Sequence, residues 1–219
     1  RKLATILATD CVDFSKHMEA QEELTLASLT SCREIIDPII EEHGGRIFHT
    51  AGDSVIAEFG SPVECVNAAM KFQEAIASRN ENIEEGPKLE WRVGIHVDDV
   101  IIEGKNIYGS GVNIAARLES QCEPGKIIFS RIVQEQVQKR VNFIVNSAGT
   151  RSLKNISDEF EVFYISKSIE ESTPNGPLQN GDFGKSYDFN LDGINKKPRL
   201  AVLPFTNDRR DEESGYLAD

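Results

Sequence analysis

Two aspartates, Asp10 and Asp53, stand where neighbouring strands would bring their carboxylates together. Asp10 follows a short apolar run at residues 3–9, and Asp53 lies between runs at residues 46–50 and 54–59. The first run is typical of a buried strand, and the other two predict a hairpin with an acid at its tip. Adjacent strands would make the carboxylates a site for Mg²⁺ or Mn²⁺, and two such ions about 4 Å apart can activate a hydroxyl and steady a leaving phosphate. Either aspartate alone is more typical of a turn or a helix cap.

A second set of candidate residues lies in the glycine-containing run at residues 106–119. Asn113 and Arg117 are four positions apart at the start of a predicted helix, so both project from one face. The guanidinium of Arg117 offers a planar fork of donors that suits a phosphate. The two glycines at 109 and 111 do not indicate dinucleotide binding, because no G-x-G-x-x-G follows a first strand.

Hydrophobic periodicity places these residues among alternating strands and helices. Apolar residues recur at helical spacing between residues 26 and 40, and Ser61 opens a second helix that runs to about Ser78. Residues 89–97 alternate apolar and polar, which predicts a half-buried strand. The other expected elements are a strand at 100–102, a helix from about 111 to 121, a strand at 127–129, a helix near 132–139 and strands near 143 and 161–165.

The composition excludes several classes of protein. With 36 acidic and 24 basic residues, the net charge is −12, which argues against binding to nucleic acid or an anionic membrane surface. No run approaches the roughly 20 apolar residues of a membrane span, and no signal-peptide pattern opens the sequence. Four cysteines without a C-x-x-C pair suit a reducing compartment, and we interpret them as apolar core residues. We therefore expect a cytoplasmic protein without a membrane span in this segment.

A change in composition marks a domain boundary after residue 168. Residues 169–198 contain four glycines, three prolines and four asparagines without apolar periodicity, which predicts a flexible linker. Residues 199–219 begin with a strand-like run and are too few to complete a fold, so we interpret them as the start of a truncated C-terminal domain. The first domain is expected to span residues 1–168.

Four motifs, in order, resemble the catalytic domain of class III adenylate and guanylate cyclases over about residues 1–167. The resemblance implies an α+β, ferredoxin-like fold with a central, mainly antiparallel sheet, helices on one face and the other side contributing to a homodimer. Residues 200–206 resemble, over a short stretch, the segment after the cyclase domain in bacterial cyclases that carry tetratricopeptide repeats. The motifs are Ile6-Leu-Ala-Thr-Asp10, Arg46-Ile-Phe-His-Thr-Ala-Gly-Asp53-Ser, Gly94-Ile-His-Val-Asp-Asp-Val100 and Gly109-Ser-Gly-Val-Asn113-Ile-Ala-Ala-Arg117-Leu-Glu.

The resemblance implies a role for each of five residues. Asp10 and Asp53 would bind two Mg²⁺ or Mn²⁺ ions, which deprotonate the ribose 3′-hydroxyl of ATP and coordinate its triphosphate. Asn113 would orient the ribose, Arg117 would stabilise charge on the α-phosphate, and Lys154 resembles the family's phosphate-binding lysine. The family's site lies across a dimer interface, so a monomer should be inactive.

Four positions depart from the family pattern. His49 stands where adenylate cyclases of this family usually have lysine, and Asn106 where they have aspartate or threonine. As donor and acceptor this pair reads adenine, whereas the reversed tautomer and amide would read guanine. Because the pair lacks the glutamate and cysteine usual for guanylate cyclases, ATP is favoured and GTP remains possible. Asp13 and Asp98 replace customary glycines, and a charge at Asp13 could weaken nucleotide binding or recruit a metal.

Two further readings stay open at this point. A catalytically degenerate cyclase domain would serve as a dimerisation or nucleotide-sensing module; the unusual His49 and Asn106 favour it, and the retained Asp10 and Arg117 oppose it. A diguanylate-type cyclase shares the strand-and-hairpin metal geometry. Its hairpin normally carries consecutive acids, whereas Ser54 follows the hairpin aspartate here.

Overall fold

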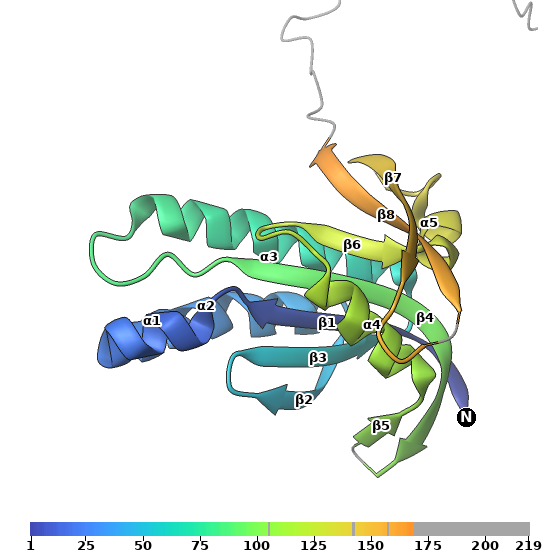
Figure 1. Cartoon of the computed structure of the whole chain (residues 1–219), viewed down its shortest axis with the longest axis horizontal. Helices are drawn as coiled ribbons and strands as arrows, with labels where there is room; N and C mark the ends of the chain where they lie inside the picture. Colours follow the sequence, from blue (N-terminus) through green and yellow to red (C-terminus); the bar gives the residue numbers. More distant parts are fainter. Residues whose placement is uncertain (105, 142, 157, 169–219) are drawn as a thin grey trace, which may run out of the picture. The chain divides into compact units, whose positions relative to one another are not determined.

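The computed structural model describes residues 1–104, 106–141, 143–156 and 158–168 (Figure 1). The predicted linker at 169–198 and the predicted truncated domain at 199–219 lie outside the described residues. Among the helices that are described, none has the length and apolar character needed to cross a membrane.

Strands and helices follow one another largely as the periodicity predicts. The strands are β1 (Lys2–Cys11), β2 (Arg46–Ala51), β3 (Ser54–Phe59), β4 (Trp91–Glu103), β5 (Asn106–Tyr108), β6 (Ile127–Ser130), β7 (Phe143–Ser152) and β8 (Glu159–Ser168). The helices are α1 (Phe14–Ala20), α2 (Glu22–Glu42), α3 (Pro62–Asn82), α4 (Ser110–Ser120) and α5 (Arg131–Val137). Ser61 caps α3 by accepting a hydrogen bond from the backbone N–H of Glu64, as its capping pattern predicts.

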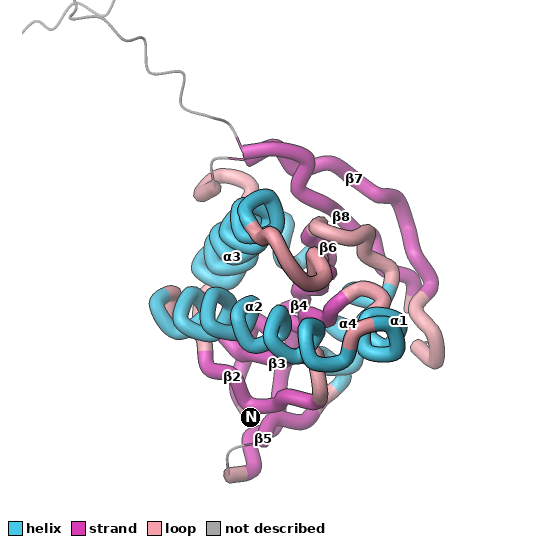
Figure 2. Tube along the Cα trace, turned by 90° about the vertical axis from the view of Figure 1, so that its left-hand side faces the viewer, coloured by secondary structure: helices cyan, strands magenta, loops and turns pink. Residues whose placement is uncertain are grey.

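The strands form one sheet in the order β2-β3-β1-β4-β6-β8-β7, with β5 paired to the end of β4. Each of these pairs is antiparallel except β4 with β6. The view in Figure 2 separates β7 and β8 at one end of the sheet from β2 and β3 at the other. The α+β fold with a mainly antiparallel sheet is therefore confirmed.

Helices cover both faces of the sheet, so the expectation of helices on one face was wrong. On one face, α2, α3 and α5 enclose the main core, in which Trp91 and Phe72 are fully buried. On the other face α4 packs against β1 and β4, and Figure 1 shows it in front of β4. The reason lies in β1, where Leu7 joins the main core while its neighbours Ile6 and Ala8 pack towards α4.

The prediction of a half-buried strand at 89–97 was also wrong, because β4 lies between two helical layers. Val93 and Ile95 face the main core, while Gly94 and His96 are buried on the opposite side. A Cβ on Gly94 would come within 2.3 Å of the carbonyl oxygen of Ala115 in α4, so the glycine lets the helix approach the strand closely. The predicted separate strand at 100–102 is the last part of β4.

Candidate active site

The antiparallel pairing of β1 with β3 brings the two predicted metal ligands together. Asp10 is the second-last residue of β1, and Asp53 lies in the tight turn between β2 and β3. Gly52 allows that turn with a φ of 61°. The backbone N–H of Cys11 donates to Oδ2 of Asp53 at 3.1 Å, which fixes the hairpin tip beside the end of β1.

The carboxylate of Asp53 is close enough to contribute to a raised pKa of Asp10. Burial raises the pKa of Asp10 to about 6, and the charge of Asp53 together with a hydrogen bond between the two side chains adds to the rise. The neighbouring Arg92 lowers the pKa but does not cancel these effects. Two neighbouring carboxylates in a partly buried site favour a divalent cation, because the cation removes their repulsion.

The two carboxylates of Asp10 and Asp53 fit Mg²⁺ or Mn²⁺ as part of its coordination shell. Magnesium is commonly bound by one or two carboxylates, with water and substrate phosphates as its other ligands. Among the described residues, no group of three or more His, Cys, Asp or Glu side chains could enclose a metal ion. The Cys11 thiol beside the pair stays neutral, because burial raises its pKa to about 12. The pair would therefore hold an ion only together with ligands from outside these side chains.

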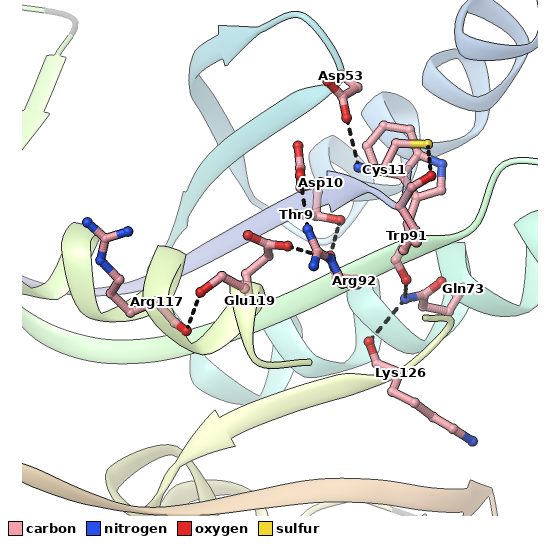
Figure 3. A network of polar contacts seen from close by, with 12 residues as sticks. Thr9, Asp10, Cys11, Asp53, Gln73, Trp91, Arg92, Arg117, Glu119 and Lys126 are labelled. Carbon is pink, nitrogen blue, oxygen red and sulfur yellow. Dashed lines mark hydrogen bonds and ion pairs between the residues drawn. The ribbon is translucent and has the colours of Figure 1, made fainter. Parts of the chain in front are cut away.

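Arg92 is a residue of this site that we did not single out in the sequence. It pairs with Asp10 across β1 and β4, and its Nη2 lies 3.2 Å from Oδ2 of Asp10. Its Nε lies 2.9 Å from Oε1 of Glu119 at the end of α4 (Figure 3). The strand register, which the sequence motif does not display, brings Arg92 to the carboxylates.

The two other residues with predicted catalytic roles lie on the exposed face of α4. Asn113 and Arg117 are both exposed, while Ile114, Ala115 and Leu118 of the same helix are buried. Figure 3 shows the Arg117 side chain extending away from Asp10 and Asp53. One chain therefore does not bring Arg117 to its own carboxylate pair.

The predicted base-reading and phosphate-binding residues are exposed as well. His49 lies on β2 and Asn106 on β5, and these two strands contact each other. Nδ2 of Asn106 lies 3.4 Å from the hydroxyl oxygen of Tyr108. Lys154 lies in the turn between β7 and β8, directly after the buried Leu153. All three side chains are therefore on the surface of a single chain.

The two aspartates that replace customary glycines have local structural partners. Asp13 has a φ of 54°, a backbone conformation that glycine adopts freely and aspartate tolerates, and its carboxylate pairs with Lys16 at 2.7 Å. Oδ2 of Asp98 accepts a hydrogen bond of 2.7 Å from the hydroxyl of Ser110, the first residue of α4. Both charges are therefore engaged within the chain.

Comparison with known proteins identifies the family. The family described as Adenylate and Guanylate cyclase catalytic domain matches residues 2–167. A Rhizobium meliloti (strain 1021) protein named "Putative adenylate cyclase 3" is 34% identical over 221 residues, covering 100% of this chain and 36% of that protein. The receptor-type guanylate cyclase gcy-23 of Caenorhabditis elegans is 28% identical, covering 77% of this chain and 17% of that protein. The chain thus spans about a third or less of the length of these relatives.

Solved structures agree with the family. The adenylate/guanylate cyclase/hydrolase from Silicibacter pomeroyi has a TM-score of 0.71 at 34% identity, covering 76% of this chain and 98% of that chain. The adenylyl cyclase CyaB from P. aeruginosa shares the fold, with a TM-score of 0.67 at 23% identity over 77% of this chain and 96% of that chain. This chain belongs to the adenylate and guanylate cyclase catalytic domain family.

Proposed function

We propose that this domain converts ATP to 3′,5′-cyclic AMP and pyrophosphate, with two divalent ions at a site built from two copies of the chain. The observation that carries the proposal is the division of the predicted residues within one chain. Asp10 and Asp53 form one half-site, whereas Arg117 extends away from them on the exposed face of α4. Family membership supports nucleotide cyclisation, and a second copy is the simplest source of the missing half.

The chain's own residues have separate tasks in this reaction. Asp10 and Asp53 hold Mg²⁺ or Mn²⁺ and so fix where the triphosphate lies. When bound, the ions lower the pKa of the ribose 3′-hydroxyl and neutralise phosphate charge. The partner copy contributes Asn113 to orient the ribose, and Arg117 and Lys154 to the phosphates. Arg117 acts on the α-phosphate, because a guanidinium stabilises the charge that develops there.

The bond changes balance without a further reactant. The 3′-oxygen forms a bond to the α-phosphorus, and the bond from that phosphorus to the bridging oxygen of the β-phosphate breaks. Pyrophosphate leaves with the electron pair of the broken bond, and the hydroxyl proton passes to solvent. The chain needs to provide position and charge stabilisation only, which suits a site made of carboxylates and exposed cations.

We further propose that His49 and Asn106 read the base. His49 would donate to adenine N1, and the side-chain carbonyl of Asn106 would accept from the exocyclic amine. The contact between β2 and β5 supports a shared task for the two residues. Because the reversed tautomer and amide would pair with guanine, GTP is the competing substrate that the test must include.

The test is to incubate the purified chain with each of the four nucleoside triphosphates and Mn²⁺, and to identify products by mass. We expect cyclic AMP and pyrophosphate in equal amounts, with ATP the best substrate. Asp53→Asn is the matched control, because it keeps the shape of the hairpin tip and removes one metal ligand. Cyclic GMP as the main product would overturn the substrate, and no cyclic product from any nucleotide would favour a degenerate domain.

A further inference from the structure

Glu119 connects the helix that carries Arg117 to the carboxylate pair of the same chain. It lies at the end of α4, is 8% exposed, and approaches Nε of Arg92 at 2.9 Å. The same guanidinium places Nη2 3.2 Å from Asp10. Figure 3 shows Arg92 between the two carboxylates, one of which is the proposed metal ligand.

Arg92 lies where it could compete with a metal ion for the carboxylate of Asp10. A guanidinium can bind one carboxylate through two parallel hydrogen bonds. A carboxylate bound in that way has fewer oxygen lone pairs left to coordinate a cation. Here Nε of Arg92 forms a 2.9 Å ion pair with Oε1 of Glu119 without a hydrogen bond between the two atoms, and Asp10 receives only the Nη2 amino group. Arg92 and Glu119 are both largely shielded from water, with side chains 25% and 11% exposed, so their attraction is weakly screened.

We propose that Glu119 is a positioning residue for the metal half-site, whose ion pair with Nε of Arg92 draws the guanidinium away from Asp10 and thereby keeps Asp10 available to a divalent cation. This inference rests on the proposed function, in which Asp10 is a metal ligand. Burial opposes the negative charge of Glu119, and Arg92 favours it. Burial raises its pKa to about 7 against the opposing effect of Arg92, and the charges of Asp10 and Asp53 contribute to the rise. Arg92 is the neighbour that stabilises the charged form of Glu119, which the ion pair between the two side chains requires.

The test measures Mn²⁺ binding to the full chain without nucleotide, from the electron paramagnetic resonance signal of free Mn²⁺. We expect Glu119→Gln to raise the Kd for Mn²⁺ about tenfold, the scale on which partners of metal ligands act. Glu119→Asp keeps the charge but reaches less far, so it should raise the Kd about threefold and serves if Glu119→Gln fails to fold. Glu41→Gln on the exposed side of α2 is the control and should leave the Kd unchanged.

Repeating the Glu119 substitution in a protein that already lacks Arg92 distinguishes positioning of Arg92 from a direct effect of the Glu119 charge on the metal. In Arg92→Gln protein no guanidinium remains to be held, so adding Glu119→Gln should change the Kd by less than about threefold. An equal tenfold change in both backgrounds would overturn the proposal, and so would native Mn²⁺ affinity in both Glu119 variants. Binding is measured without turnover, so failure of the proposed cyclisation would be seen in the product assay and not here.

In turnover assays the same role predicts a specific kinetic pattern. Glu119→Gln should raise the Mn²⁺ concentration needed for half-maximal rate about tenfold, while kcat at saturating Mn²⁺ stays within about twofold. A variant that merely loosened α4 would instead lower kcat at every Mn²⁺ concentration, because α4 carries Asn113 and Arg117. That second pattern would contradict the proposal.

Discussion

Ionised Asp10 lowers the stability of the folded protein when no cation is bound, because it is desolvated and lies beside Asp53. Asp10→Asn should therefore abolish cyclisation while the melting temperature of the metal-free protein at pH 7.5 stays equal or rises. A carboxyl whose pKa is raised on folding destabilises the fold increasingly as the pH rises from its unfolded value of 3.8 to its folded value of about 6, and it has no effect once it is protonated in both states. The gain in melting temperature should accordingly be full at pH 7.5 and mostly lost near pH 4. Full turnover by Asp10→Asn would remove the metal assignment.

Base selection by His49 and Asn106 can be tested by removing the ambiguity of each side chain. Lysine can only donate and ionised aspartate can only accept, so His49→Lys combined with Asn106→Asp excludes the pairing with guanine. A typical hydrogen bond contributes roughly 0.5–1.5 kcal/mol, so two changed positions together should raise the ATP/GTP ratio of kcat/KM about tenfold. An unchanged ratio in a folded, active double variant would show that these residues do not face the base.

At the scale of elements, the close contact of α4 with β4 should be sensitive to a single methyl group. A Cβ on Gly94 would lie 2.2 Å from the backbone nitrogen of Glu119, and backbone cannot move aside as a side chain can. Gly94→Ala should lower the free energy of unfolding by about 1–3 kcal/mol or more, measured by urea denaturation. Gly60→Ala is the matched control, because its Cβ would meet nothing within 4 Å. Equal stability of the two variants would contradict the described packing.

His96, which lies on β4 beside Ser130 and Phe160, makes the stability of the fold depend on pH. It is 3% exposed, its Nδ1 lies 2.7 Å from Oγ of Ser130, and burial lowers its pKa to about 4. Asp98 opposes that shift. Because the unfolded chain takes up the proton near pH 6.5, the contribution of His96 to stability is lost as the pH falls from about 6.5 to 4, by up to about 3 kcal/mol.

The measurement is urea denaturation of native protein and His96→Gln between pH 4 and 7.5. The native protein should lose stability more steeply than His96→Gln over the interval from pH 6.5 to 4. His17→Gln is the comparison variant, since His17 is only partly buried on α1. Parallel pH profiles for the native protein and His96→Gln would show that His96 is protonated as easily in the folded chain as in the unfolded one.

Local signals predicted the elements that depend on local chemistry, and tertiary packing decided the rest. The cap at Ser61 and the apolar run of β1 are readable because a few adjacent residues determine them. The three residues of β5 carry no such signal and were missed. Asp10 and Asp53 could be paired from the motif, but Arg92 and Glu119 join them only through the register of β1 with β4 and the position of α4.

At the scale of the whole molecule, we propose that a single chain contains two incomplete half-sites. The carboxylate pair lies at the end of β1, while the predicted base-reading and phosphate-binding residues are exposed on α4, β2, β5 and the turn between β7 and β8. A symmetric dimer would combine each half with its complement and so create two equal sites. The central claim of the account is that catalysis occurs at such combined sites.

Mixing two inactive variants tests that claim most directly. Asp53→Ala lacks one half-site and Arg117→Ala the other, so each alone should be inactive, while a mixed dimer has one site with both halves intact. With free exchange of subunits, about half of the dimers are mixed and each has one intact site, so cyclic AMP production should recover to about a quarter of the native rate. The account predicts this recovery. Mixed dimers demonstrated by native mass spectrometry but without cyclic AMP production would contradict it.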